Sequence, residues 1–231
     1  MKKTFFLYYS IIFCLCGNAQ TNEICIKKIL IESPNLSLPF YLKKDNNLNY
    51  KEFNEETISC ALFNKDKSKL FYHFTYYDND LMKNVEKIRK YYFRILGCYK
   101  KNNLYILIYE KGGNDTLQTY LLTFINEILI DEIVVGFEEG GGETEMMKYK
   151  ESIITENLEV KTRYYEWNPE YIDKKTRKNP DTPKTIVTLA NYKIDENSGK
   201  ILLIKQENKY SNCIPEEFSY PESNCNIFDK P

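Results

Sequence analysis

The stretch that decides the fold is Leu104–Phe124, which reads LYILIYEKGGNDTLQTYLLTF. Its outer runs, Leu104–Glu110 and Thr116–Phe124, are rich in leucine, isoleucine and aromatic residues. Between them, Lys111–Asp115 contains two glycines, an asparagine and an aspartate. Apolar runs separated by a short glycine-containing turn are typical of antiparallel strands. The stretch therefore predicts a β-hairpin.

The same pattern continues on both sides of this hairpin. Polar or glycine-containing turns separate further apolar runs, and short connections force neighbouring strands to be antiparallel. We therefore expect a mainly β protein, arranged as an antiparallel meander, an open barrel or a partial propeller-like sheet, with one or two short helices in the N-terminal half. The additional strands are predicted at Tyr92–Tyr99, Ile128–Glu138, Glu145–Ile154, Leu158–Trp167, Thr185–Ile194 and Lys200–Gln206.

Three of the predicted strands end in similar turns, at Ile125–Glu127, Ile154–Asn157 and Ile194–Asn197. Another strand follows each turn within a few residues, which suits one two-stranded unit repeated along the chain. Turns favour such polar residues in any protein, so the similarity has a second explanation that needs no repeat.

The N-terminal half is less regular. Cys25–Ile31 and the aromatic-rich Leu70–Tyr77 are predicted strands. Glu55–Phe63 is predicted to be a short helix, because Asn54 suits an N-cap and two glutamates lie in the first turn. Asp80–Arg89 carries apolar residues at helical spacing, but it is also short enough to be a loop.

The first nineteen residues have the organisation of a secretory signal peptide. Two lysines precede the nearly continuous apolar run Phe5–Cys16, twelve residues long, and small residues follow up to Ala19. A helix of that length spans ~18 Å, less than the ~30 Å hydrocarbon core, which disfavours a membrane anchor. We expect an exported mature chain that begins near Gln20, in the periplasm or outside the cell. The alternative is a chain tethered to the membrane by lipidation of Cys16.

After the signal peptide at residues 1–19, we expect one folded unit from residue 20 to residue 210. Residues 20–100 hold the short helix and the first strands, residues 101–210 form the meander, and residues 211–231 form a cysteine-containing tail. No later run of eighteen apolar residues indicates a transmembrane segment.

Charge argues against a nucleic-acid partner. The 231 residues carry 32 basic and 33 acidic side chains, for a net charge of -1. Few of the basic residues are arginine, the side chain that phosphate and base recognition favour.

Five cysteines follow the signal segment: Cys25, Cys60, Cys98, Cys213 and Cys225. In an oxidising compartment, Cys213 and Cys225 are the predicted disulfide pair, because they enclose a short proline-containing tail. Cys60 and Cys98 lie in apolar stretches, where a buried thiol is the simpler interpretation. The chain has one histidine and no CxxC spacing. A zinc site or a thioredoxin-like centre therefore lacks its ligands.

Several short segments, in a fixed order after the export signal, resemble a group of uncharacterised exported β-rich proteins of Bacteroidetes-type bacteria. The resemblance implies an antiparallel β architecture and export, and no known activity accompanies it. The turn Ile125–Glu127 departs from the glycine-bearing turn usual in that group. The matching segments are Leu38–Phe40, Glu55–Thr57, Tyr120–Phe124 with Ile130–Asp131, and Tyr192–Ile194 with Lys200–Ile201.

The most conspicuous candidate site is the acidic, glycine-rich segment between residues 138 and 145. Carboxylates on a flexible loop suit calcium, a hard cation that prefers oxygen ligands. The segment lacks the ligand spacing of an EF-hand, however, and it lies where a hairpin must turn. We expect no cofactor and no metal, with calcium as the less favoured alternative. The candidate binding residues are Glu138, Glu139, Glu143 and Glu145.

A second candidate is the aromatic group Tyr164, Trp167 and Tyr171, at the end of a predicted strand. Aromatic side chains give large contact areas at low entropic cost, which suits a recognition surface. Strand alternation would bury either Tyr164 or Tyr165, but not both. The alternative role for these aromatic residues is packing in the sheet.

These observations favour an exported binding or interaction module of the cell envelope that is not an enzyme. Its partner would be an unknown protein or an envelope polymer, because no nucleophile motif or metal-ligand spacing marks a catalytic centre. One alternative is a hydrolase with unrecognised carboxylate chemistry. Another is a lipid-tethered structural component of the envelope.

Overall fold

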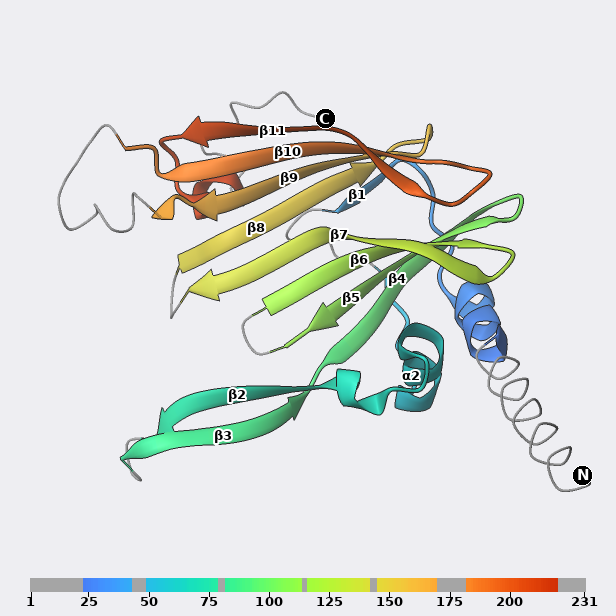
Figure 1. Cartoon of the computed structure of the whole chain (residues 1–231), viewed down its shortest axis with the longest axis horizontal. Helices are drawn as coiled ribbons and strands as arrows, with labels where there is room; N and C mark the ends of the chain where they lie inside the picture. Colours follow the sequence, from blue (N-terminus) through green and yellow to red (C-terminus); the bar gives the residue numbers. More distant parts are fainter. Residues whose placement is uncertain are drawn as a thin grey trace, which may run out of the picture.

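The computed structural model describes residues 23–42, 49–78, 82–113, 116–141, 145–169 and 182–219. Its main feature is an antiparallel meander in which eight consecutive strands lie in the order β11-β10-β9-β8-β7-β6-β5-β4 (Figure 1). The sheet is not closed, because β4 and β11 do not pair with each other. The predicted β-rich architecture and antiparallel meander are therefore confirmed.

The strands follow the predicted runs closely, and most extend beyond them by a few residues. The central hairpin is formed as predicted by β5 and β6, whose register pairs Leu104 with Ile125. The strands of the meander are β4 Tyr92–Lys101, β5 Leu104–Gly112, β6 Thr116–Ile125, β7 Ile128–Gly141, β8 Glu145–Ile154, β9 Glu159–Trp167, β10 Thr185–Ile194 and β11 Ile201–Ser211.

The sheet splits between β7 and β8. These two strands pair only where Phe137–Gly141 lies beside Glu145–Lys150. The rest of β8 pairs with β1 (Phe40–Leu42), which takes the place of β7 beside Ser152–Ile154. The meander therefore consists of two halves, β4 to β7 and β8 to β11, that diverge along one line.

The two halves meet again at the end where the hairpin tips lie. The hydroxyl of Thr123 in β6 donates to the carbonyl of Gly199, before β11, at 2.6 Å. The backbone N–H of Ile201 donates to Asp131 in β7 at 2.9 Å. These contacts hold the sheet in a curled, open form.

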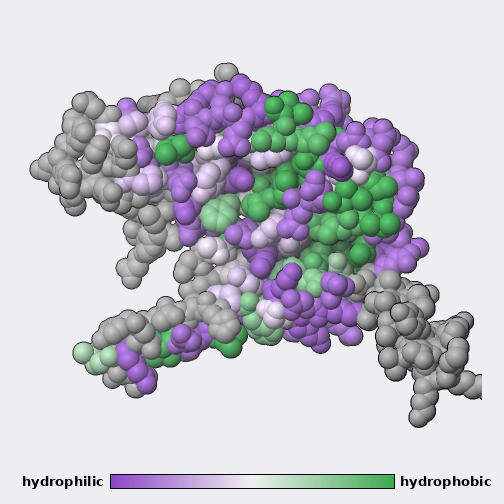
Figure 2. Space-filling view, in the orientation of Figure 1, coloured by the Kyte–Doolittle hydropathy of each residue, from purple (hydrophilic) through white to green (hydrophobic). Residues whose placement is uncertain are grey.

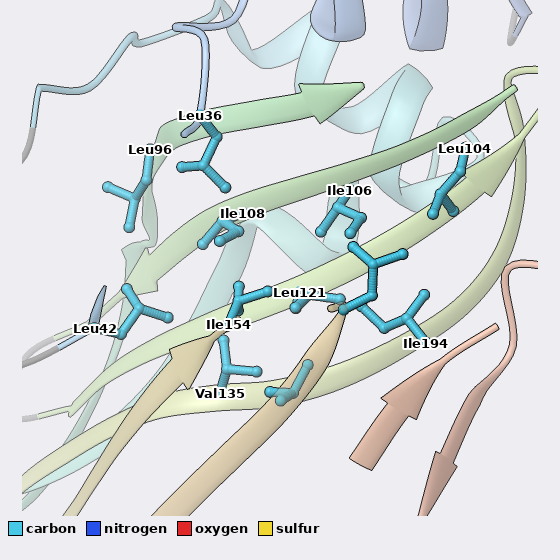
Figure 3. Packing of buried hydrophobic residues seen from close by; sticks show 12 residues of the cluster. Leu36, Leu42, Leu96, Leu104, Ile106, Ile108, Leu121, Val135, Ile154 and Ile194 are labelled. Atoms are coloured by element: carbon cyan, nitrogen blue, oxygen red, sulfur yellow. The ribbon is translucent and has the colours of Figure 1, made fainter. Parts of the chain in front are cut away.

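The main hydrophobic core fills the space between the two halves. Figure 3 shows Ile106, Ile108 and Leu121 from β5 and β6 pointing toward Ile154 and Ile194 from β8 and β10. Burial of such side chains is the largest favourable contribution to folding. The buried members of this cluster are Leu36, Leu42, Leu96, Leu104, Ile106, Ile108, Leu121, Val135, Ile154, Leu158, Val160 and Ile194.

The other face of β4 to β6 is covered by helices. Residues 23–32 are helical, and α2 spans Glu55–Phe63, as predicted, with the Asn54 side chain accepting from the N–H of Thr57 at 2.8 Å. After α2 follows the short 3-10 helix η1 (Lys67–Leu70). Buried members of this second cluster include Ile29, Leu30, Ile58, Leu70, Phe93, Ile95, Leu107 and Phe124.

The predicted strand at Cys25–Ile31 is wrong, because these residues lie in the helix 23–32. Ile29 and Leu30 are buried, and Ile26 packs against the same cluster, whereas Lys27 and Lys28 are exposed. Apolar residues three and four positions apart share one face of a helix. The spacing was therefore helical, and the shortness of the apolar run concealed it.

The predicted helix or loop at Asp80–Arg89 is also wrong where the structure describes it. β2 (Phe71–Asp78) and β3 (Lys83–Lys90) form a separate two-stranded sheet. Figure 1 shows this hairpin projecting from the end of the meander. Its aromatic first strand supplies a pairing partner, which overrides the helical spacing of the second strand.

The structure contains one disulfide that the sequence did not predict. Cys25 and Cys60 form a disulfide, with their Cα atoms 6.0 Å apart, so the expectation of a buried thiol is wrong for Cys60. It is confirmed for Cys98, which is a buried free cysteine. Cys213 is disulfide-bonded as well, and Cys225, its predicted partner, lies outside the described residues.

The outer face of β8 to β10 carries a third apolar cluster. The 3-10 helix η2 (Pro215–Ser219) packs there, and the ring of Phe218 stacks on Tyr165 at 4.4 Å between centroids. Figure 2 shows apolar surface toward the hairpin tips, where exposed apolar residues include Leu202, Leu203 and Ile204.

Among the helices that the structure describes, none is long and apolar enough to cross a membrane. The predicted signal segment, residues 1–19, lies outside the described part of the chain.

Candidate functional site

The candidate site lies where β8 stops pairing with β7 and begins to pair with β1. A bulge in β7 leaves the carbonyl oxygens of Val134 and Val135 beside β8. They accept hydrogen bonds from side chains of β8: Lys150 Nζ donates to Val134 at 3.0 Å, and the hydroxyl of Ser152 donates to Val135. Side chains therefore satisfy buried acceptors that a continuous ladder would pair with backbone N–H groups.

Lys150 belongs to a row of side chains that crosses the sheet. The register places Phe137 beside Lys150, Lys150 beside Tyr164, and Tyr164 beside Thr188. Directly paired residues of neighbouring strands project to the same face. The next row on this face contains Ser152, Thr162, Ala190 and Gln206.

Residues of these rows line a cavity of about 390 Å³ that extends from β6 and β7 across β8 to β11. This volume is in the range of about 300 to 1,000 Å³ that is usual for ligand sites. Its polar lining consists of Lys150, two threonines and two glutamines, and its aromatic lining consists of Phe137, Tyr164 and Tyr192. Val134 and Ala190 complete the lining, and none of the ten lining residues bears a carboxylate.

The ammonium group of Lys150 is the only formal charge in this lining. Burial lowers the pKa of Lys150, because the protein replaces part of the water that would solvate the charged form. The ammonium lies 5.8 Å from the centre of the Tyr164 ring, which offers a favourable cation–π contact. Of its three donors, one is used by Val134.

Tyr164 forms the aromatic wall beside this lysine. Its ring meets Phe137 edge-on, with centroids 6.3 Å apart. Burial, together with the nearby carboxylates of Glu166 and Glu139, raises the pKa of Tyr164 to about 12. The phenol therefore stays protonated at neutral pH and presents a hydroxyl donor.

A set of ion pairs occupies the adjacent row. Lys148 Nζ lies 3.1 Å from Glu139 and 3.9 Å from Glu166. All three side chains are about one third exposed, so the pairs are screened by solvent and contribute little stability. Their charges compensate one another in part, whereas the lining contains no counterion for Lys150.

Two of the four predicted acidic residues, Glu138 and Glu139, lie toward opposite faces of the sheet. Glu139 lies beside the cavity, but Glu138 contributes to the raised pKa values of Tyr92 and Glu110, near the opposite face. Glu143 lies outside the described residues, and for Glu145 only the backbone, in β8, is described. The segment up to Gly141 is strand rather than loop.

Of the residues predicted to form an aromatic surface, Tyr164 lines the cavity. Tyr164 lines the cavity and Tyr165 is buried, which confirms that alternation buries only one of them. Trp167 is buried, with 5% of its surface exposed, so its assignment to an exposed edge is wrong. Tyr171 lies outside the described residues.

The sequence patterns did not predict Lys150, Thr162, Thr188 or Gln206 as site residues. A signal was present, because alternate residues of the strands change from apolar near the turn to polar further along. In β8 the series is Ile154, Ser152, Lys150, and in β9 it is Val160, Thr162, Tyr164. Such a change predicts a core that gives way to a polar cavity along one face.

A second cavity, of about 270 Å³, lies between α2 and the start of β4. An ion pair between Glu55 and Lys90 lies at its lining. Within the described ranges, no group of three or more histidine, cysteine, aspartate or glutamate side chains is placed to hold a metal ion.

No protein-family model, curated protein or solved structure matches this chain.

Proposed function

We propose that this protein is an exported binding protein of the cell envelope, that it is not an enzyme, and that the cavity beside Lys150 holds part of an acidic envelope polysaccharide. The observation that carries the proposal is the cavity lining, which combines aromatic rings, hydroxyl and amide groups and a single ammonium. The predicted export signal and the resemblance to exported proteins agree with this location.

The neutral part of the lining suits a sugar ring. A sugar presents an apolar C–H face and several hydroxyls that both donate and accept. Tyr164 and Tyr192 offer apolar ring surface, and the threonine hydroxyls and glutamine amides both donate and accept hydrogen bonds. Thr162 and Thr188 donate to Ala190 and Asn208, and their hydroxyl oxygens keep acceptor capacity that a sugar hydroxyl can use and a purely apolar ligand cannot.

Lys150 suits an acidic sugar in particular. Two of its three donors have no acceptor among the residues that the structure describes. A half-buried ammonium without a counterion is unfavourable, and a carboxylate or another anionic group on the ligand would supply one. The same charge would disfavour a basic ligand.

The disulfides support the proposed location. Cys25 is bonded to Cys60, and Cys213 is also disulfide-bonded. Stable disulfides form in oxidising compartments such as the periplasm or the outside of the cell. The cavity also favours binding over the hydrolase alternative, because the carboxylate pair that glycosidases use is not among its lining residues.

The proposal is tested by binding to an array of neutral and acidic envelope oligosaccharides. The parent chain is compared with Lys150→Met, which keeps the length of the side chain and removes its charge. A lost charge-assisted hydrogen bond is worth about 1.5 to 3 kcal/mol, so acidic members should bind at least ~10-fold more weakly. Neutral members should be affected less.

Lys161→Met is the matched control, because Lys161 is an exposed lysine of the neighbouring strand β9. Both variants should melt near the parent temperature. If no acidic member is retained by the parent, or if Lys150→Met binds as tightly as the parent, the proposal is wrong. Release of cleaved sugar by the parent would favour the hydrolase alternative.

A further inference from the structure

β11 forms an open edge of the sheet. It pairs with β10 on one side, and in the described part of the chain no strand pairs with its other side. Open edges present unpaired backbone groups that readily accept another strand. Near its start, the edge is occupied by Asp131, which accepts from the N–H of Ile201. The free part therefore begins further along the strand.

The register shows which backbone groups face outward. The N–H of Ile194 donates to Leu158, and the N–H of Asn168 donates to Lys184. Even-numbered residues of β10 therefore bond to β9, and its odd-numbered residues bond to β11. The odd-numbered residues of β10 pair with Lys205, Glu207, Lys209 and Ser211 of β11. Because backbone groups alternate sides along a strand, those of Gln206, Asn208 and Tyr210 face the open edge.

The side chains of this segment alternate in charge. Lys205, Glu207 and Lys209 lie two residues apart, so they share one face of the strand. Glu207 lies between the two lysines, 2.7 Å from Lys205 and 3.7 Å from Lys209. The pattern is positive, negative, positive along the strand.

We propose that β11 pairs antiparallel with β11 of a second copy of this chain, with Asn208 opposite its own counterpart. Gln206, Asn208 and Tyr210 then exchange roughly six backbone hydrogen bonds across the junction. Glu207 lies opposite Lys209 of the second copy, and Lys209 lies opposite Glu207. The two sheets become one continuous sheet about a twofold axis.

Charge complementarity favours a second copy of this chain as the partner of β11. Charged residues on an edge often prevent association, but a protective row of one sign would repel its own copy. Here the alternation makes the strand complementary to itself in an antiparallel arrangement. When Asn208 lies opposite its counterpart, the ladder between the two copies covers only residues 205 to 211. It therefore does not reach the contact between Ile201 and Asp131.

The test is sedimentation velocity of the mature chain over a concentration series, at low and high salt. The parent should dimerise in a concentration-dependent manner, more weakly at high salt. Glu207→Lys places lysines opposite lysines and should weaken dimerisation at least tenfold. The triple variant Lys205→Glu, Glu207→Lys, Lys209→Glu restores alternation and should dimerise again, but it should not pair with the parent chain.

Asn208→Pro provides an independent check, because proline lacks an N–H and that group faces the open edge, outside the ladder with β10. It should block dimerisation. Melting temperatures verify that each variant is folded. A parent chain that stays monomeric over the whole series, or a Glu207→Lys variant that dimerises as tightly as the parent, overturns the proposal. Association with an unrelated peptide in place of a second copy would overturn it as well.

Discussion

Removing the disulfide between Cys25 and Cys60 tests how the N-terminal helix is held on the sheet. The bond joins helix 23–32 to α2 and closes a loop with a sequence separation of 35 residues. In the chain-entropy model, a cross-link of this length removes ~13 cal/mol/K from the unfolded ensemble. This entropy corresponds to about 4 kcal/mol of stability at 25 °C.

The measurement is thermal unfolding of the double variant Cys25→Ala, Cys60→Ala. One kcal/mol shifts the melting temperature of a protein of this size by ~2 to 4 °C, so the expected decrease is ~8 to 16 °C. A double variant is preferable to a reducing agent, because Cys213 is also disulfide-bonded and would be reduced too.

Cys98→Ala is the matched control, since it removes the sulfur of a buried cysteine without opening a loop. Its decrease should be smaller, because only packing is lost. If the double variant melts within the error of this control, covalent closure contributes nothing, and the packing of Ile29 and Leu30 alone holds the helix.

Three further predictions follow from single residues. Burial raises the pKa of Cys98 to about 12, so iodoacetamide at pH 8 should label this thiol only as fast as the protein unfolds. Rapid labelling of the native chain would contradict its burial. Burial lowers the folded-state pKa of Lys150 below its unfolded value, so between these two pKa values the unfolded state holds more protons. The free energy of unfolding of the parent should therefore rise with pH relative to that of Lys150→Met. A constant difference between the two in urea titrations through the alkaline range would be evidence against this prediction. Glu127 has a φ of 69°, a left-handed conformation that favours glycine. Glu127→Gly should therefore raise the free energy of unfolding by about 1 kcal/mol, reduced by the small contribution of the surface ion pair with Lys27. A free energy of unfolding below that of the parent in a urea titration would show that the ion pair matters more.

The meander was predictable because each of its hairpins is local in sequence. The prediction for β10, Thr185–Ile194, matches the structure at both ends. Turns that contain left-handed residues, such as Asn126 and Glu127, delimit the strands sharply. The N-terminal half was harder, because helix 23–32 depends on packing against strands that lie far along the chain. Its short apolar run therefore did not reveal which of two periodicities applied.

The site was only partly predictable, for a reason that Trp167 illustrates. Alternation places Tyr165 and Trp167 on the outer face of β9, and the sequence gives no sign that the segment around Phe218 returns to pack on that face. Tyr164, on the inner face, was identified because aromatic composition alone singled it out. Lys150 was not, because its importance depends on the split between β7 and β8, a break that no local pattern encodes.

The same split separates a structural role for Lys150 from a binding role. Ser152 satisfies the carbonyl of Val135 with a neutral hydroxyl, so the break in the ladder does not itself require a charge. Lys150 satisfies the neighbouring carbonyl with one donor, and it adds two donors and a positive charge that the carbonyl does not need. Partial burial makes that charge unfavourable for the isolated protein, as the lowered pKa of Lys150 indicates. Replacing Lys150 by methionine removes one charge-assisted hydrogen bond to Val134, worth about 1.5 to 3 kcal/mol, and also relieves a partly buried charge that has no counterion in the lining, so the two effects on stability offset each other. Lys150→Met should therefore keep the stability of the parent while losing the acidic ligand.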